Sequence, residues 1–404
     1  MQTHRYEEVN SLRVDNIKEL SDLRVVLSTR GKFHTFDLAR QMQSRGALVS
    51  IFTGYPKFKL KNENLPPNSI KTFPWLQAPY MGIRRKSEWL NRLWEWQIAI
   101  QFDRYVAERL PPCDVFCGLS GSALETGKVA KRRGAKFVCD RGSSHIRFQD
   151  QILRKEYELQ GIKFAGIDPR FIAREEAEYD LADLITVPST FVFNSFVKFG
   201  IRPEKLRQVP YGVDLSRFKP VGKPHEKAFH VLYVGGLTVR KGILYLVQAF
   251  EQLQHGGKHL TLVGSVDGSM ANYVDKLRNR PDVSVTGHIE QQRLRDIMSG
   301  SHVMVLPSIE EGLALVQAQA MACACPVIAT ANTGGLDIFT DGVEGFIVPI
   351  RNPDAIAAGL QRLADTPSLQ KEMSAAALQR VQALGGWATY GDKMYQTFGE
   401  LVGA

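Results

Sequence analysis

Short apolar runs alternate with amphipathic segments along most of the chain. Each run is rich in valine, leucine and isoleucine and ends at glycine or a polar residue. Such runs predict buried parallel strands, and the amphipathic segments between them predict helices that cross over a sheet. In the first half the predicted strands are residues 23–28, 48–52, 114–117, 136–139 and 184–187, and we expect 184–187 to be the last of them.

The same alternation begins again in the second half. Its predicted strands are residues 229–234, 260–263, 283–286, 303–306 and 326–329. Residues 209–224, which contain three prolines and two glycines, separate the two sets and predict a linker or hinge. Each half is therefore expected to be a doubly wound α/β unit. Because ligands of such sheets bind beyond the carboxyl ends of the strands, we expect function where the loops of the two halves meet.

The charge is distributed unevenly over this chain of 404 residues. Its net charge is +9, from 51 basic and 42 acidic residues. Residues 1–200 hold 31 basic and 23 acidic residues, and the rest of the chain holds 20 and 19. A protein dedicated to nucleic acid usually carries a larger and more clustered excess, so nucleic acid is not an expected partner. Almost all of the excess positive charge therefore lies in the first half of the chain.

Cysteine usage and the apolar segments favour a cytoplasmic protein. The five cysteines form no C-x-x-C pair and have no histidine at metal-ligand spacing, which is typical of buried thiols in a reducing compartment. The first 20 residues lack the apolar core of a signal peptide, and polar residues interrupt the charge-free stretch 312–336. We therefore expect neither secretion nor a transmembrane helix. Since no Asp-x-Asp precedes an apolar strand, no metal is expected, and no other cofactor.

A basic, glycine-rich loop follows the predicted strand 229–234. It reads Gly-Gly-Leu-Thr-Val-Arg-Lys-Gly over residues 235–242 and leads into an amphipathic helix. Glycines allow close backbone approach, and a helix N-terminus with two cations attracts an anion, so the loop predicts a phosphate site. It matches neither the P-loop nor the dinucleotide-binding pattern. An ordinary strand-to-helix turn with solvated basic residues is the alternative.

Two glutamates, Glu310 and Glu311, precede the predicted helix 315–323. Carboxylates at a helix N-terminus interact favourably with the helix dipole, which is a purely structural explanation. A carboxylate is also a natural acceptor for sugar hydroxyls. Gln319 lies about two helical turns after Glu311, so both side chains fall on roughly one helix face and can meet the same ligand.

The order of these motifs resembles the retaining, nucleotide-sugar-dependent glycosyltransferases of family 4, glycosyl transferases group 1. The resemblance covers nearly the whole chain and rests on residues 209–220, 233–242, 307–327, 333–335 and 341–349. It implies the GT-B fold, in which two Rossmann-like doubly wound domains face each other across a cleft. The implied parts are an acceptor-side domain over residues 1–208, a nucleotide-sugar donor domain over 209–385, and a C-terminal helix in 386–404 that packs back on the first domain.

The resemblance also implies roles for individual residues. Lys241 falls where the family grips the donor diphosphate, Glu311 where it contacts the donor sugar, and His145 where it often places an active-site histidine; a satisfied loop histidine is the alternative for His145. The implied donor-binding residues are Gly31, Gly235, Gly236, Arg240, Gly312, Leu313, Ala314, Leu315 and Gln319. The expected acceptor contacts are Lys32, His34, Asp140 and Arg141.

Three features depart from the family pattern, and one of them is that Gly312-Leu313-Ala314 stands where the family usually has Gly-Phe-Gly. Gly236 stands where the family usually has an arginine, so Arg240 is expected to supply the second cation beside Lys241. Gln319 stands where the family has the second glutamate of its Glu-(seven residues)-Glu signature, which binds the ribose. Glutamine still offers an acceptor oxygen, but its hydrogen bonds lack the strength that a charge gives.

The implied activity is metal-independent, retaining transfer of a hexose from a UDP- or GDP-linked donor to a glycan or lipid-linked acceptor, in polysaccharide or glycoconjugate biosynthesis. Lys241, Arg240 and helix-terminal amides would then meet the charge of the leaving group. The leaving phosphate helps to take the proton of the acceptor hydroxyl. The alternatives are a non-catalytic protein of this fold that binds sugar or nucleotide sugar, and a nucleotide-sugar epimerase.

A basic and aromatic segment of the first half has the composition of a surface that contacts a membrane. Residues 71–109 contain four of the five tryptophans, and residues 84–86 are Arg-Arg-Lys. A buried aromatic helix of the first domain would explain this pattern. The alternative is a peripheral surface that touches an anionic membrane at its cytoplasmic face, which agrees with the positive surplus of the first half and with an anionic or lipid-linked acceptor.

Overall fold

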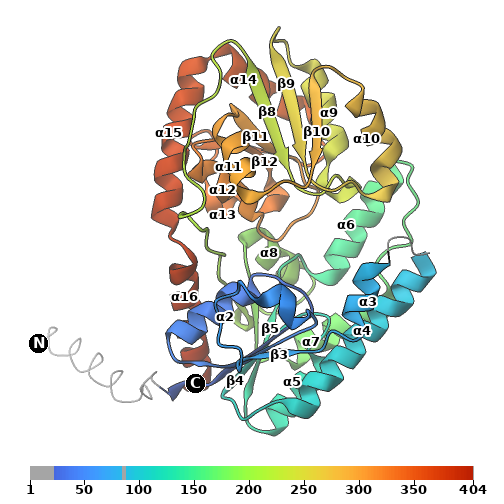
Figure 1. The fold of residues 1–404 in the computed structure, drawn as a ribbon. Helices are drawn as coiled ribbons and strands as arrows, with labels where there is room; N and C mark the ends of the chain where they lie inside the picture. The colour runs from blue at the N-terminus through green and yellow to red at the C-terminus, as the bar shows by residue number, and fades with distance from the viewer. Residues whose placement is uncertain (1–21, 84–87, 404) are drawn as a thin grey trace, which may run out of the picture.

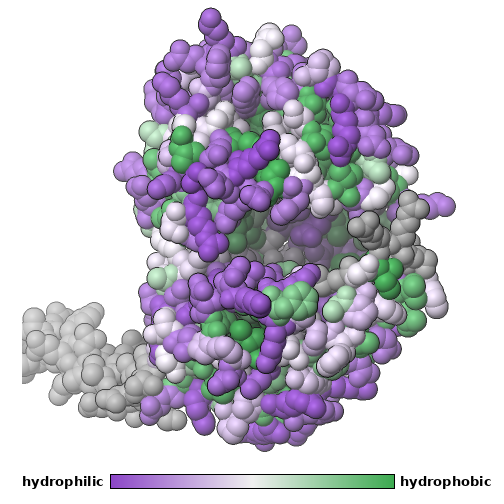
Figure 2. Space-filling view, in the orientation of Figure 1, coloured by the Kyte–Doolittle hydropathy of each residue, from purple (hydrophilic) through white to green (hydrophobic). Residues whose placement is uncertain are grey.

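The chain forms two α/β domains, which a computed structural model describes for residues 22–83 and 88–403 (Figure 1). Each domain contains one parallel sheet with helices packed around it. The prediction of two doubly wound units is therefore confirmed. The space-filling view is hollowed between the two domains, and hydrophilic side chains line part of the hollow (Figure 2).

The first domain is built on a seven-stranded sheet with the order β3-β2-β1-β4-β5-β6-β7. Its strands are β1 (Val25–Thr29), β2 (Leu48–Thr53), β3 (Ile70–Thr72), β4 (Val115–Leu119), β5 (Lys136–Asp140), β6 (Leu184–Val187) and β7 (Leu206–Gln208). Its helices are α2 (Thr35–Ser44), α3 (Gln77–Gly82), α4 (Glu88–Arg109), α5 (Leu124–Arg132), α6 (Ile146–Leu159), α7 (Pro169–Leu181) and α8 (Thr190–Lys198), with short 3₁₀ helices η2 (Lys57–Leu60) and η3 (Pro203–Lys205).

The second domain is built on a six-stranded sheet with the order β10-β9-β8-β11-β12-β13. Its strands are β8 (Phe229–Val234), β9 (Lys258–Val263), β10 (Val283–Gly287), β11 (Val303–Leu306), β12 (Val327–Thr330) and β13 (Gly345–Val348). Its helices are α9 (Ile243–Gln252), α10 (Ala271–Arg278), α11 (Gln291–Ser299), α12 (Leu315–Ala322), α13 (Gly335–Ile338), α14 (Pro353–Asp365) and α15 (Pro367–Leu384), with η4 (Val239–Lys241), η5 (Gly268–Met270) and η6 (Ala331–Thr333).

The central strands and the edge strand β10 match the sequence pattern, whereas the edge strands β3, β7 and β13 do not. The bounds of β6, β8 and β11 are those predicted. The expectation that residues 184–187 end the first sheet is wrong, because β7 pairs in parallel with β6. β3 and β7 have three residues each with only one buried, so neither forms an apolar run, and β13 is also an unpredicted edge strand.

Alternate residues of the buried strand β1 explain why helices cover both faces of the first sheet. Val25 and Leu27 belong to one apolar cluster together with Phe36 of α2. Val26 belongs to a second cluster together with Phe102 of α4. Because successive side chains of a strand point to opposite faces, an uninterrupted apolar run needs cover on both sides.

The C-terminal helix α16 (Trp387–Gly403) lies against the first domain. Tyr390, Met394 and Phe398 are buried in the same cluster as α2. The chain thus crosses between the domains twice, and the two crossings touch: a Cβ on Gly212 would lie 2.4 Å from the backbone nitrogen of Trp387. This close approach requires glycine and defines the hinge.

Helix α6 also connects the two domains, on the side of the molecule opposite the hinge. It belongs to the first domain by sequence, yet Figure 1 shows it reaching the second domain on the side away from α15 and α16. Its partly buried Ile152 and Tyr157 pack against the core of the second domain. The cleft is therefore bounded by the hinge on one side and by α6 on the other.

Candidate functional site

Loops that follow the carboxyl ends of four strands converge on the cleft. Residues 30–34 follow β1 and residues 141–145 follow β5 in the first domain. Residues 235–242 follow β8 and residues 307–314 follow β11 in the second. Parallel strands bring these loops to one edge of each sheet, which is where open α/β sheets bind ligands.

The predicted phosphate loop is folded tightly against the acidic loop of the same domain. The Thr238 side chain caps η4 by accepting a hydrogen bond from the Lys241 backbone N–H at 3.3 Å. Gly242 has a φ of +68°, and a Cβ there would lie 2.0 Å from the Pro307 carbonyl oxygen. Only glycine fits this left-handed contact. The start of α9 therefore brings two cations beside two carboxylates.

Two consecutive cations pair with two consecutive glutamates. The Arg240 Nε lies 3.0 Å from Oε2 of Glu310, and Lys241 forms an ion pair with Glu311. Both carboxylates are buried, Glu310 completely. Burial and the neighbouring Arg240 lower the pKa of Lys241 to about 7. In the absence of a ligand, Lys241 is thus paired with the Glu311 carboxylate, while its burial disfavours its charged form.

The loop after Glu311 joins the two domains through backbone atoms. A Cβ on Gly312 would lie 1.8 Å from the Gly142 carbonyl oxygen, and the Gly312 carbonyl accepts a hydrogen bond from the Ser189 hydroxyl at 2.6 Å. Leu313 and Ala314 are buried in the core of the second domain. Any donor contact by these two residues must come from their backbone, whereas the half-buried Leu315 begins α12.

Gln319 and Gln317 of α12 have different environments. Gln317 is completely buried and donates from Nε2 to the carbonyls of Ala314 and Thr333 at 3.3 and 3.0 Å, so it is part of the framework. The half-buried Gln319 makes no side-chain hydrogen bond within residues 22–83 and 88–403. Of the two amides, Gln319 is the one that retains its hydrogen-bonding capacity for a ligand.

His34 and Asp140 meet on the first-domain side of the cleft. The Nε2 of His34 lies 2.6 Å from Oδ2 of Asp140, and Oδ1 of that carboxylate accepts from the Thr186 hydroxyl at 3.0 Å. The imidazole also stacks on Tyr211 of the hinge, with ring centroids 4.2 Å apart. His34 is thus held in one orientation beside the loop that contains Gly142.

The other expected acceptor contacts are occupied by the protein itself. The half-exposed Lys32 forms an ion pair with Glu63. The buried guanidinium of Arg141 pairs with Glu175 at 2.7 Å and donates to the Ser144 carbonyl at 3.1 Å. Arg141 therefore stabilises its own loop, and its role as a substrate contact is not supported by these bonds.

His145 has the environment of a packed loop residue. It is buried, stacks on Phe199 with ring centroids 4.8 Å apart, and lies beside Tyr179 and Phe196. Its Nδ1 accepts the backbone N–H of Arg147 at 3.2 Å, which caps α6. Burial lowers the pKa of its imidazole to about 4. These contacts favour the structural alternative over a catalytic role.

Arg30 is a cation beside the candidate site that the sequence analysis did not single out. It directly follows β1 and precedes Gly31, and its guanidinium lies 5.6 Å from the centre of the Phe171 ring. Burial lowers its pKa, and within the described residues it makes no hydrogen bond or ion pair. Its position next to a glycine at the end of the first strand was the only signal available.

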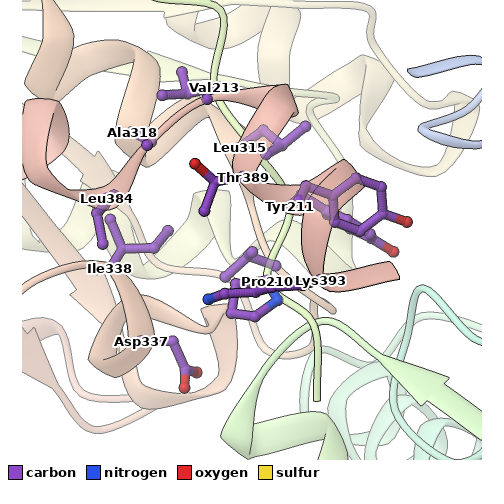
Figure 3. A pocket seen from close by; sticks show the side chains of 15 residues that line it. Pro210, Tyr211, Val213, Leu315, Ala318, Asp337, Ile338, Leu384, Thr389 and Lys393 are labelled. Carbon is purple, nitrogen blue, oxygen red and sulfur yellow. The ribbon is translucent and has the colours of Figure 1, made fainter. Parts of the chain in front are cut away.

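A cavity of about 150 Å³ lies at the hinge, between residues 210–213 and the start of α12 (Figure 3). Pro210, Tyr211 and Val213 line it together with Leu315 and Thr389. The Tyr211 hydroxyl is buried without a hydrogen-bond partner among the described residues. Within residues 22–83 and 88–403, no group of three or more histidine, cysteine, aspartate or glutamate side chains is arranged to hold a metal ion.

Comparison with known proteins agrees with this architecture. The chain matches the family model of glycosyltransferase family 4 over residues 32–217 and that of the glycosyl transferases group 1 over residues 216–380. The two models together span both domains. The fold is GT-B, and the protein belongs to the family 4, group 1 glycosyltransferases.

Individual relatives are distant. A D-inositol 3-phosphate glycosyltransferase of Catenulispora acidiphila is 28% identical over 257 residues, which are 58% of this chain and 61% of that protein. Sucrose-phosphate synthase from Thermosynechococcus elongatus superimposes with a TM-score of 0.72 at 23% identity, covering 94% of this chain and 99% of that one. Anabaena HepE in complex with UDP and glucose gives 0.69 at 15% identity, covering 93% and 99%. The chain thus aligns with about three fifths or less of the curated relatives' length.

Proposed function

We propose that this protein transfers a hexose from a nucleoside-diphosphate sugar to an acceptor, with retention of configuration and without a metal ion. The arrangement of Arg240 and Lys241 against Glu310 and Glu311 carries this proposal. A diphosphate would replace Glu311 as the partner of Lys241, since the two anions compete for one cation. The released Glu311 carboxylate then accepts hydrogen bonds from the sugar hydroxyls.

In the proposed reaction, a bond forms between the acceptor oxygen and the anomeric carbon while the bond from that carbon to the phosphate oxygen breaks on the same face of the sugar. The proton of the acceptor hydroxyl passes to the departing phosphate. Lys241 and the backbone N–H groups before α9 stabilise the charge that develops on the nucleoside diphosphate. The protein supplies position and electrostatics, and the leaving group supplies the base.

A donor screen tests this proposal. We expect one nucleotide among UDP-, GDP- and ADP-sugars to raise the melting temperature and to be hydrolysed slowly in the absence of acceptor, with no loss of rate in EDTA. Thermal shift and release of nucleoside diphosphate measure the two effects. If no nucleotide sugar binds, the glycosyltransferase assignment of the site is wrong, and binding without turnover would identify a non-catalytic protein.

The acceptor is proposed to carry a negative charge. Arg30 lies at the start of the loop that follows β1, in the half of the chain that holds the positive surplus, and its guanidinium makes no hydrogen bond or ion pair within residues 22–83 and 88–403. We expect Arg30→Gln to raise the KM for a phosphorylated acceptor at least about tenfold, because a charge-assisted hydrogen bond is worth about 1.5–3 kcal/mol, while donor hydrolysis stays unchanged. D-inositol 3-phosphate and inositol form a matched pair for initial rates, since a relative is named for the former.

The control for this prediction is Arg132→Gln on the exposed end of α5. An unchanged KM in Arg30→Gln, or an equal change in both variants, would show that Arg30 does not bind the acceptor.

A peripheral contact with the cytoplasmic face of a membrane is proposed for the α3–α4 edge of the first domain. Trp75 and Trp89 are 75% and 71% exposed there, and Ile83, which directly follows α3, is also exposed. The basic triplet 84–86 lies outside the described residues. None of the helices in the described ranges is long and apolar enough to cross a bilayer. Sedimentation with anionic vesicles, compared with neutral vesicles and with Trp89→Ser, tests the contact.

A further inference from the structure

One buried carboxylate, Glu310, touches both halves of the proposed site. It precedes the sugar-binding Glu311, and its side chain is completely buried. We infer that Glu310 is a positioning residue that couples the donor-phosphate cation Arg240 to the acceptor-side loop 141–145. This inference rests on the proposed function, and it assigns the coupling to a residue that makes no direct contact with substrate.

On the acceptor side, Glu310 accepts three hydrogen bonds from the first domain. Its Oε1 accepts the backbone N–H of Ser144 at 3.0 Å and the Ser144 hydroxyl at 2.8 Å. Its Oε2 accepts Nε2 of Gln149, on α6, at 3.0 Å. Gln149 in turn accepts from Nη2 of Arg141 at 3.0 Å. The carboxylate therefore fixes both ends of the loop that follows β5.

On the donor side, Glu310 holds Arg240 by one edge. Nε of Arg240 lies 3.0 Å from Oε2 and 2.9 Å from the Glu310 backbone carbonyl. The Arg240 side chain remains one-third exposed. A guanidinium has five N–H donors, so a grip through Nε leaves the terminal nitrogens for an anion. Movement of Arg240 toward a diphosphate would be transmitted through Oε2 to Gln149 and through Oε1 of the same carboxylate to Ser144.

The charge of Glu310 makes this coupling strong. Burial alone would raise the pKa of its carboxyl, but Arg240 and the hydrogen bonds from Ser144 and Gln149 bring that pKa below its ordinary value. A buried carboxylate must keep its partners, because losing one leaves an uncompensated charge. Arg240 and Ser144 are thus partners of one carboxylate, so a shift in the position of either side chain alters the hydrogen bonds of the other.

A simpler role would be to hold the two domains together, and α6 offers a matched control for it. Glu156, also buried, accepts Nε of Arg351 at 2.6 Å and the Tyr245 hydroxyl at 2.9 Å, both from the second domain. Glu156 lies on α6, the helix that also carries Gln149, so it is a second carboxylate that joins the two domains, but it contacts neither Arg240 nor loop 141–145. Glu156→Gln therefore weakens the domain contact without touching the coupling.

Hydrogen-exchange mass spectrometry tests the coupling on the full chain. The probe is whichever of UDP, GDP and ADP gives the largest thermal shift. In the wild type we expect saturating nucleotide to slow exchange at both 238–243 and 141–149. In Glu310→Gln, slowing at 238–243 should persist and slowing at 141–149 should be lost, and the ratio of sugar transfer to donor hydrolysis should fall about tenfold. Ser144→Ala should weaken the same effect without removing a charge.

The outcomes separate two failures. If none of the three nucleotides binds, the proposed function fails first. If nucleotide binds but Glu310→Gln keeps the slowing at 141–149, or if Glu156→Gln loses it equally, Glu310 is no more than a domain contact. Should Glu310→Gln fold poorly, Ser144→Ala and its transfer-to-hydrolysis ratio decide the question alone.

Discussion

Replacement of Lys241 by alanine is expected to lower kcat by about 10²–10³, the size found when one preorganised donor to a developing negative charge is removed. The reason is local. Lys241 lies at the N-terminus of α9 beside Arg240, and in the described residues its anionic partner is Glu311. No metal is proposed for the site, so the leaving diphosphate depends on these cations. Steady-state kinetics with the donor found by the screen measure the effect.

A pH readout shows whether the Lys241 effect is electrostatic. The free protein holds Lys241 with a pKa of about 7, and a lysine paired with phosphate keeps its proton to a much higher pH. Nucleotide binding should therefore take up a proton between about pH 7 and 10, and affinity should fall as the pH rises, by at most about tenfold per unit. Calorimetry in two buffers of different ionisation enthalpy counts the proton.

Lys227→Ala, on an exposed segment of the same domain, is the control. Normal turnover in Lys241→Ala, or an unchanged pH slope of its nucleotide affinity, would exclude Lys241 from the phosphate site.

Glu311→Gln is expected to lower kcat/KM by about 10²–10³, because hydrogen bonds to a charged acceptor are worth about 1.5–3 kcal/mol each and a sugar offers more than one hydroxyl. The Glu311 carboxylate is buried, and its Oε1 also accepts from the Ser308 hydroxyl at 3.2 Å. Glutamine preserves the volume and removes the charge. The loss should therefore reflect chemistry rather than packing.

Two affinities distinguish a sugar contact from a phosphate contact at Glu311. In Glu311→Gln, affinity for the nucleotide sugar should fall, whereas affinity for the nucleoside diphosphate alone should hold or rise, because Lys241 no longer has a competing anion. Glu226→Gln, on an exposed turn, serves as the control. Equal losses for both ligands would assign Glu311 to the phosphates instead of the sugar.

The central strands and the loops that follow them could be read from the sequence because their signals are local. A run such as Val303–Leu306 is buried on both faces and therefore apolar throughout, and glycines and charged residues mark the loop after it. The same signals are weak in β3 and β7, where a single buried residue leaves no pattern. Tertiary pairing, not local preference, makes those segments strands.

Some residues of the candidate site could likewise be predicted from local sequence, and others could not. Lys241 lies in a loop whose glycines and cations predict an anion site, and Glu311 lies in a loop whose carboxylates predict a polar ligand. His145 shows the limit of such reasoning, because a polar residue in a post-strand loop looks the same whether it faces the cleft or packs under Phe199. Arg30 shows the converse, because its burial beside Phe171 depends on segments that are far apart in the sequence.

The sequence by itself determined the central strands of both sheets, the basic and acidic loops of the second domain, and the family to which the chain belongs. Only the tertiary structure decided which charges meet. Ser144 and Glu310 are 166 residues apart, and their contact exists because two separately folded domains close on each other. Local patterns record burial and turn geometry within one element, whereas the pairing of charges across a cleft depends on how whole domains are placed, which no single segment encodes.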